Sequence, residues 1–261
     1  MVRHALPFAA LALALVARPA VAANPDALWH IVHDECVPHQ EKDHSPEPCA
    51  EVNLGNGYAV MQNGTGYAVL KDIVGKTQYL LIPTAKIGGM ESPEILSPDA
   101  PNYWQDAWQA RRFVDARVGH ELPRDVISLA INSIDGRTQN QLHIHVDCVR
   151  LDVRAALRDH ANDIGDTWTR FPVELVGHNY MVRRLQQAEI TGTNPFVLLA
   201  DGIPEAHADM AHYTLVVVGA NFAGKDGFVL LADHADLARG NRGSGEQLQD
   251  HACAAAEATG G

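Results

Sequence analysis

The chain has 261 residues, of which 46% are hydrophobic and 20% are charged, so it can bury the core of one large domain or two small ones. Its formal net charge is −12 with neutral histidines. Binding to a phosphate backbone requires a basic surface, so we expect no nucleic-acid partner. A phosphorylated ligand would have to meet a local cluster of Arg, Lys and His side chains.

The N-terminus is typical of a targeting segment. Arg3 precedes an uncharged, mostly apolar run over residues 5–17, and residues 20–23 are small, as at a cleavage site. At about 1.5 Å per helical residue the run spans roughly 20 Å, short of the ~30 Å hydrocarbon core of a bilayer. A cleaved signal is the simpler interpretation, but an anchor is also open because the apolar run resumes after Arg18. We expect residues 1–23 to be a signal peptide or membrane anchor and residues 24–261 to form the domain.

The predicted elements of the first half are a helix, a hairpin and a second helix. Apolar residues at helical spacing predict a helix over residues 24–40. Two β-branched runs, 66–71 and 77–83, flank a short polar turn and predict an antiparallel hairpin. The helix over 102–118 follows Pro101 and can end at a glycine. A further strand is expected over 125–132.

The stretch Gln-Leu-His-Ile-His-Val-Asp-Cys, residues 141–148, places two histidines one residue apart in an apolar strand. Strand side chains alternate between faces, so Gln141, His143 and His145 share one face while the apolar residues enter the core. Two such histidines can simply form a solvated strand face. Here the preceding turn carries hydrogen-bond donors, and these donors indicate phosphate chemistry. They are Arg137, Thr138, Gln139 and Asn140, with Asn132 at the end of the partner strand.

A metal site is the alternative interpretation of the same strand. His143, His145 and Asp147 lie on one face and could bind an ion in an exported metal-binding module, although zinc usually takes further ligands. The neighbouring arginine and amide donors suit an anion better than a cation. We therefore expect no metal and no cofactor in the site.

The second half is expected to add a helix over residues 153–160, capped by Asp152, and several strands. The expected strands are 171–176, 180–185, 196–200, 213–218 and 228–232. Together these elements predict an α+β fold with an antiparallel sheet that the C-terminal half extends.

Four cysteines fit an exported protein, because disulfides persist in oxidising compartments. They allow three pairings. We favour the short local loop between Cys36 and Cys49, which leaves Cys148 to bond with Cys253. The second bond would hold the C-terminal tail beside the histidine strand.

The histidine strand resembles the active-site strand of the histidine-triad superfamily, with Gln141 in place of the first histidine. The chain as a whole resembles the bacterial CDP-diacylglycerol pyrophosphatases. The most specific match is Gly-Arg-Thr-Gln-Asn at 136–140 followed by His143-Ile-His145. Weaker matches extend over nearly the whole chain after residue 23. They include residues 28–29, 79–83, 91–93, 108–111, 129–133, 177–184 and 249–253.

The resemblance implies a histidine-triad-like antiparallel sheet with packed helices, and hydrolysis of CDP-diacylglycerol to CMP and phosphatidate. It implies that His143 is a nucleophile that forms a cytidylyl-histidine intermediate. His145 would bind phosphate oxygens or donate to the leaving group. The residues expected to contact substrate are Asn132, Arg137, Thr138, Asn140, Gln141, Lys86, His178 and Arg183. For the last three, a surface lysine and a salt-bridged edge strand are equally open interpretations.

A lipid substrate also implies a membrane surface as partner and a location at the periplasmic face of the bacterial inner membrane. A broader exported nucleotide hydrolase or nucleotidyltransferase is the alternative within enzymes.

Overall fold

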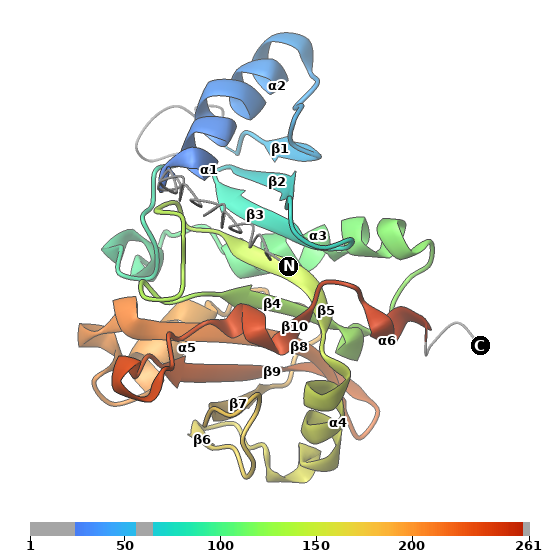
Figure 1. The fold of residues 1–261 in the computed structure, drawn as a ribbon, viewed down its shortest axis with the longest axis vertical. Coiled ribbons are helices and arrows are strands. Elements are labelled where there is room, and N and C mark those ends of the chain that lie inside the picture. Colours follow the sequence, from blue (N-terminus) through green and yellow to red (C-terminus); the bar gives the residue numbers. More distant parts are fainter. Residues whose placement is uncertain (1–23, 56–64, 258–261) are drawn as a thin grey trace, which may run out of the picture.

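One antiparallel sheet organises the part of the chain that the computed structural model describes, residues 24–55 and 65–257 (Figure 1). Its strand order is β1-β2-β3-β5-β4-β8-β9-β7-β6, with β10 paired to β5 off this path. The strands are β1 (Glu51–Asn53), β2 (Tyr67–Lys71), β3 (Tyr79–Pro83), β4 (Ile127–Ile131), β5 (Ile144–Val149), β6 (Thr169–Arg170), β7 (Met181–Leu185), β8 (Tyr213–Phe222), β9 (Lys225–His234) and β10 (Gln249–Asp250). The predicted α+β class, antiparallel sheet and C-terminal extension are confirmed.

Helices surround this sheet. Within the described residues they are α1 (Ala27–His30), η1 (Ile31–Cys36), α2 (Val37–Asp43), η2 (Pro93–Leu96), α3 (Tyr103–Val118), η3 (Arg124–Val126), α4 (Leu151–Asp159), η4 (Ala161–Asp163), α5 (Pro195–Gly202), η5 (Ala206–Ala208), η6 (Met210–His212), η7 (Leu237–Arg239), η8 (Gly245–Leu248) and α6 (Ala254–Glu257). The helices predicted over 24–40, 102–118 and 153–160 are confirmed. The predicted leader, residues 1–23, lies outside the described residues. Over residues 24–55 and 65–257, no helix combines the length and the hydropathy needed to cross a bilayer.

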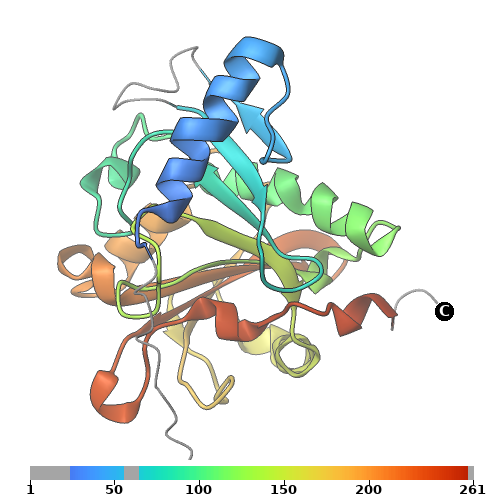
Figure 2. The same cartoon turned by 45° about the horizontal axis from the view of Figure 1, so that its top comes forward.

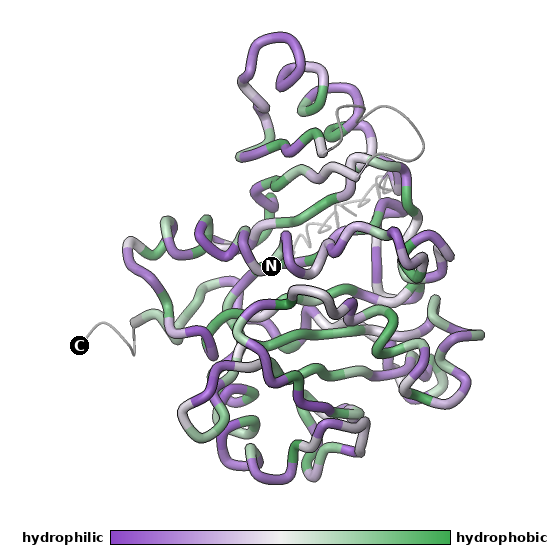
Figure 3. The backbone as a smooth tube through the Cα atoms, turned by 180° about the vertical axis from the view of Figure 1, so that it is seen from behind, coloured by the Kyte–Doolittle hydropathy of each residue, from purple (hydrophilic) through white to green (hydrophobic). Residues whose placement is uncertain are grey.

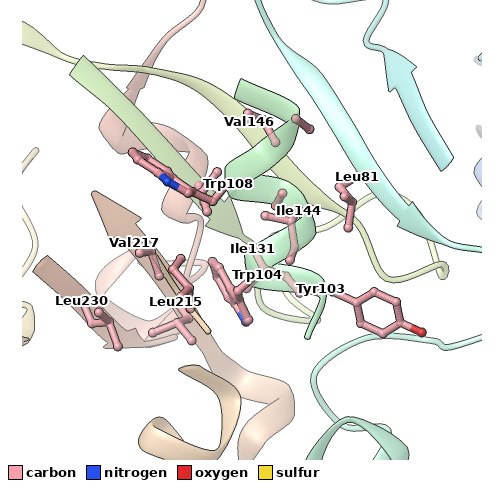
Figure 4. Packing of buried hydrophobic residues seen from close by; sticks show 14 of the residues in the cluster. Leu81, Tyr103, Trp104, Trp108, Ile131, Ile144, Val146, Leu215, Val217 and Leu230 are labelled. Atoms are coloured by element: carbon pink, nitrogen blue, oxygen red, sulfur yellow. The ribbon is translucent and has the colours of Figure 1, made fainter. Parts of the chain in front are cut away.

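The core is divided between the two faces of the sheet. On one face, the indoles of Trp104 and Trp108 on α3 pack against strand residues that include Ile144 and Val146 of β5 (Figure 4). On the other face, α1 and η1 cover β2 and β3, while α4 packs beside β8 and β9. Hydrophobic residues are concentrated in the central strands (Figure 3). Because side chains alternate along β5, the face opposite α3 receives the histidines.

Both predicted disulfides are present, Cys36–Cys49 and Cys148–Cys253, with Cα–Cα distances of 5.6 and 5.2 Å. The first joins the N-terminal helical segment to the loop before β1. The second fixes the C-terminal segment beside β5, where β10 pairs with it (Figure 2). Two disulfides indicate a location outside the cytosol.

Three local predictions are wrong. Residues 196–200 form a helix, α5, because Asn194 accepts a hydrogen bond from the amide of Phe196 and Pro195 occupies the first helical position. Residues 171–176 do not form a strand, because the chain turns at Val176 and Gly177, between Leu175 and His178, which make an isolated bridge. Finally, α4 begins at Leu151, so that Asp152 lies in its first turn instead of capping it.

Candidate functional site

His143 and His145 lie side by side on the face of β5 opposite α3. His143 immediately precedes the strand and His145 is its second residue. Their ring centroids are 4.9 Å apart, with the planes inclined by 65°. Both residues are buried, at 7% and 5% exposure, so their protonation is set by the groups around them.

The His143 ring has a defined tautomer. Its Nδ1 lies 2.7 Å from the carbonyl oxygen of Gln141. A carbonyl can only accept, so Nδ1 carries the proton and Nε2 carries the lone pair of the neutral ring. Burial lowers the pKa of His143 below its ordinary value, although the Gln141 carbonyl opposes this shift. His143 therefore presents a neutral, nucleophilic Nε2 at physiological pH.

His145 has the opposite tautomer. The side-chain amide of Gln78 donates to its Nδ1 over 2.6 Å, so the neutral ring carries its proton on Nε2. Burial, with a contribution from His143, lowers the pKa of His145. The ring is therefore a hydrogen-bond donor at Nε2 and not a source of protons at neutral pH. Its Nε2 lies 3.5 Å from Oε2 of Glu246.

Glu246 of η8 is a site residue that the sequence reasoning missed. Its Oε2 accepts from Asn132 Nδ2 over 2.9 Å and its Oε1 accepts from Gln78 Nε2 over 3.3 Å. Burial opposes ionisation, but the nearby His145 and these two amides outweigh it and lower the pKa of Glu246. The sequence signal that could have pointed to this segment is the glycine pair of Gly243-Ser-Gly245, since glycines can mark a close approach of the backbone. In the structure, a Cβ atom at Gly245 would lie 2.6 Å from Val216.

A second histidine–carboxylate pair, His251 and Asp147, lies next to Glu246. Asp147 is fully buried, and its carboxylate accepts from Nδ1 of His251 over 2.8 Å and from Thr77 Oγ1 over 2.6 Å. The bond to Asp147 raises the pKa of His251. Nε2 of His251 lies 3.6 Å from Oε1 of Glu246.

The alternative of a metal site required Asp147 to act as a ligand together with His143 and His145. In the structure the Asp147 carboxylate is bonded to His251 instead. The described ranges hold no cluster of three His, Cys, Asp or Glu residues fit to bind a metal ion.

His143 and His145 open onto a cavity of about 370 Å³. Its polar lining is formed by Asn132, Thr138, Gln139, His143, His145, Glu246, Lys71 and Asp72. Its apolar lining is formed by Ala27, Leu28, Ile31, Leu70, Ile73, Val74 and Leu80. The cavity thus combines hydrogen-bonding and apolar side chains, which suits an amphiphilic compound.

The model of the CDP-diacylglycerol pyrophosphatase family matches residues 23–257. The chain belongs to this family. A curated CDP-diacylglycerol pyrophosphatase from Yersinia pestis is 45% identical over 231 residues, which are 88% of this chain and 85% of the relative. The family predicted from the sequence is confirmed.

The structure of this pyrophosphatase-family chain brings some of the other predicted residues to the cavity. Thr138 lines it directly. The Asn132 side chain lines it too, but its amide oxygen accepts from Ser244 Oγ and its amide nitrogen donates to Glu246. Gln141 contributes the carbonyl that fixes His143, while its side chain donates to the carbonyls of Pro83 and Ala85. Asn132 and Gln141 thus position other groups.

Six predicted residues, Gln141 among them, are not among the residues that line the cavity. Arg137 binds both carboxylate oxygens of Glu91, at 2.5 and 2.7 Å. Lys86 is exposed over the ring of Trp29, 5.6 Å from its centroid. The exposed Asn140 is held through its backbone amide.

His178 and Arg183 belong to the far end of the sheet of this family member. His178 lies in the turn before β7, and Arg183 lies on β7 with its guanidinium 5.9 Å from the ring of Trp168. Strand β7 is four places from β5 in the sheet, about 19 Å at the usual strand spacing. The structure therefore does not bring these two residues to the histidines.

Proposed function

We propose that the chain hydrolyses CDP-diacylglycerol to CMP and phosphatidate through a covalent cytidylyl-histidine at His143. The observation that carries this proposal is the fixed tautomer of His143, whose Nδ1–H donates to Gln141 while Nε2 is left to attack. The names of the family and of the Yersinia pestis relative indicate the substrate, and the mixed polar and apolar lining of the cavity supports it. We also place the strand in the histidine-triad-like superfamily on the His143-Ile-His145 pattern.

In the first step, Nε2 of His143 attacks the nucleotide phosphorus and phosphatidate leaves. A phosphate is a stable leaving group, so this step needs no proton donor. The bond between Nδ1–H and the Gln141 carbonyl stabilises the cationic ring of the phosphoramidate. His145 contributes its Nε2–H to a phosphate oxygen. The ring is neutral because its pKa is lowered, and its proton is on Nε2 because Nδ1 accepts from the Gln78 amide. Thr138 is the further side chain that we expect to contact phosphate.

We infer that the substrate is taken from a membrane surface. Ile73 is fully exposed and Val74 half-exposed, and both line the same cavity as the histidines. Exposed apolar side chains beside a cavity for a lipid headgroup suit contact with acyl chains. The two disulfides and the N-terminal targeting pattern support placing this surface at the periplasmic face of the inner membrane.

The test uses CDP-diacylglycerol labelled in the nucleotide phosphate. Quenched wild-type protein is expected to carry acid-labile, base-stable label, and His143→Ala is expected to lose both label and turnover. His178→Ala is the matched control, because this histidine lies far from the cavity, and it should retain both. Turnover that survives His143→Ala would refute the mechanism. Faster turnover of a soluble dinucleotide would favour the broader nucleotide hydrolase.

A further inference from the structure

The second half of the proposed reaction needs a base that the histidines cannot supply. Water must lose a proton as it attacks the phosphorus of cytidylyl-His143. In that intermediate Nε2 of His143 is bonded to phosphorus, and its Nδ1–H is held by Gln141. Nδ1 of His145 is occupied by the Gln78 amide, and its Nε2 already carries a proton. Neither imidazole has a lone pair available to the water.

The remaining titratable groups of the cavity lining are Lys71, Asp72 and Glu246. Lys71 donates to the carbonyls of Asp72 and Gly75, which is the bonding of a protonated amine. The carboxylate of Asp72 accepts from the amide of Val74 and closes its own turn. Glu246 differs from these because its carboxylate lies beside the histidine pair, 3.5 Å from His145.

We propose that Glu246 is the general base of the hydrolytic half-reaction and that His251 is its positioning residue. This inference rests on the proposed function. The water oxygen bonds to phosphorus, its proton passes to a carboxylate oxygen of Glu246, and the phosphorus–Nε2 bond breaks with its electron pair returning to His143. CMP leaves. The carboxyl proton then reaches solvent beside His251, whose side chain is 28% exposed.

The contacts of Glu246 explain how a carboxylate is tolerated close to an anionic substrate. Asn132 and Gln78 donate to its two oxygens, and His251, itself held by the buried Asp147, faces Oε1 at 3.6 Å. These donors keep the group ionised and fix its direction. The carboxylate repels bound phosphate to some degree, but it supplies the basic oxygen that the second step requires.

The experiment separates the two half-reactions of Glu246→Gln with the same labelled CDP-diacylglycerol. This isosteric variant can still accept from Asn132 but cannot take a proton. We expect one equivalent of phosphatidate to be released in a burst, the label on protein to accumulate, and steady-state turnover to fall about 100-fold. Glu189→Gln is the control, because Glu189 accepts from Gln105 and Gln109 at the surface, outside the cavity lining, and its change should leave the label lifetime unchanged.

For His251→Asn we expect a severalfold longer label lifetime with a changed pH profile, and an unchanged burst of phosphatidate. The inference alone fails if the label on Glu246→Gln decays at the wild-type rate, or if the burst slows as much as turnover does. If the wild type hydrolyses the substrate and neither protein ever carries label, the covalent mechanism and this inference fail together.

Discussion

At the residue scale, the state of His143 determines a pH dependence. Burial lowers its pKa, so the reactive neutral ring persists at pH values below the ordinary histidine pKa of 6.5. We expect kcat/KM to stay on its plateau as the pH falls through 6.5 and to decline only in more acidic solution. The check is a profile of kcat/KM between about pH 4 and 9. An acid limb centred at or above 6.5 would contradict a buried, neutral nucleophile.

The same residues show what sequence could predict of the site. The alternation of β5 predicted that His143 and His145 share a face, because that relation is local. Glu246 and His251 reach this face from more than 100 residues away, through contacts that no local pattern specifies. Arg137 was predicted to bind phosphate because it lies in the donor-rich turn before the histidines. Its partner in the structure, Glu91, lies 46 residues away and could not be recognised from the sequence.

At the element scale, the two disulfides are expected to differ in their effect. The Cys148–Cys253 bond closes a loop of 105 residues and the Cys36–Cys49 bond one of 13. By chain entropy, their loss should cost roughly 5 and roughly 3 kcal/mol of unfolding free energy, respectively. Urea denaturation of the two double-alanine variants measures this. The variant without Cys148–Cys253 should also lose activity under native conditions, since β10 carries the chain to His251.

Strands and helices were predictable to different degrees for a physical reason. Helix α3 and the hairpin of β2 and β3 have periodic patterns and clear ends, and both were predicted. The run over residues 196–200 is apolar throughout, so periodicity could not separate a buried helix from a strand. Its cap at Asn194 and Pro195 decided the outcome, through a local hydrogen bond that hydrophobicity does not reflect.

At the scale of the whole molecule, the loop between β2 and β3 is expected to contact lipid. Ile73→Asp should reduce turnover of vesicle-embedded CDP-diacylglycerol roughly tenfold, since burial of an isoleucine in an apolar phase is worth about 1.5 kcal/mol or more. Turnover of a short-chain soluble analogue should change much less. Leu237→Asp is the matched control, because Leu237 is 59% exposed but lies outside the cavity. An equal loss on both substrates would show that the loop acts without the bilayer.

The order of the chain has a consequence for when activity begins. His143 comes about 100 residues before η8 and β10, which complete the surroundings of the proposed nucleophile. A nascent polypeptide that is still being synthesised or translocated therefore holds His143 and His145 without the carboxylate of Glu246 beside them. Repeated turnover would begin only after η8 and β10 have emerged and joined the sheet, so that on the side of the membrane where the chain is made each molecule would cleave at most one liponucleotide.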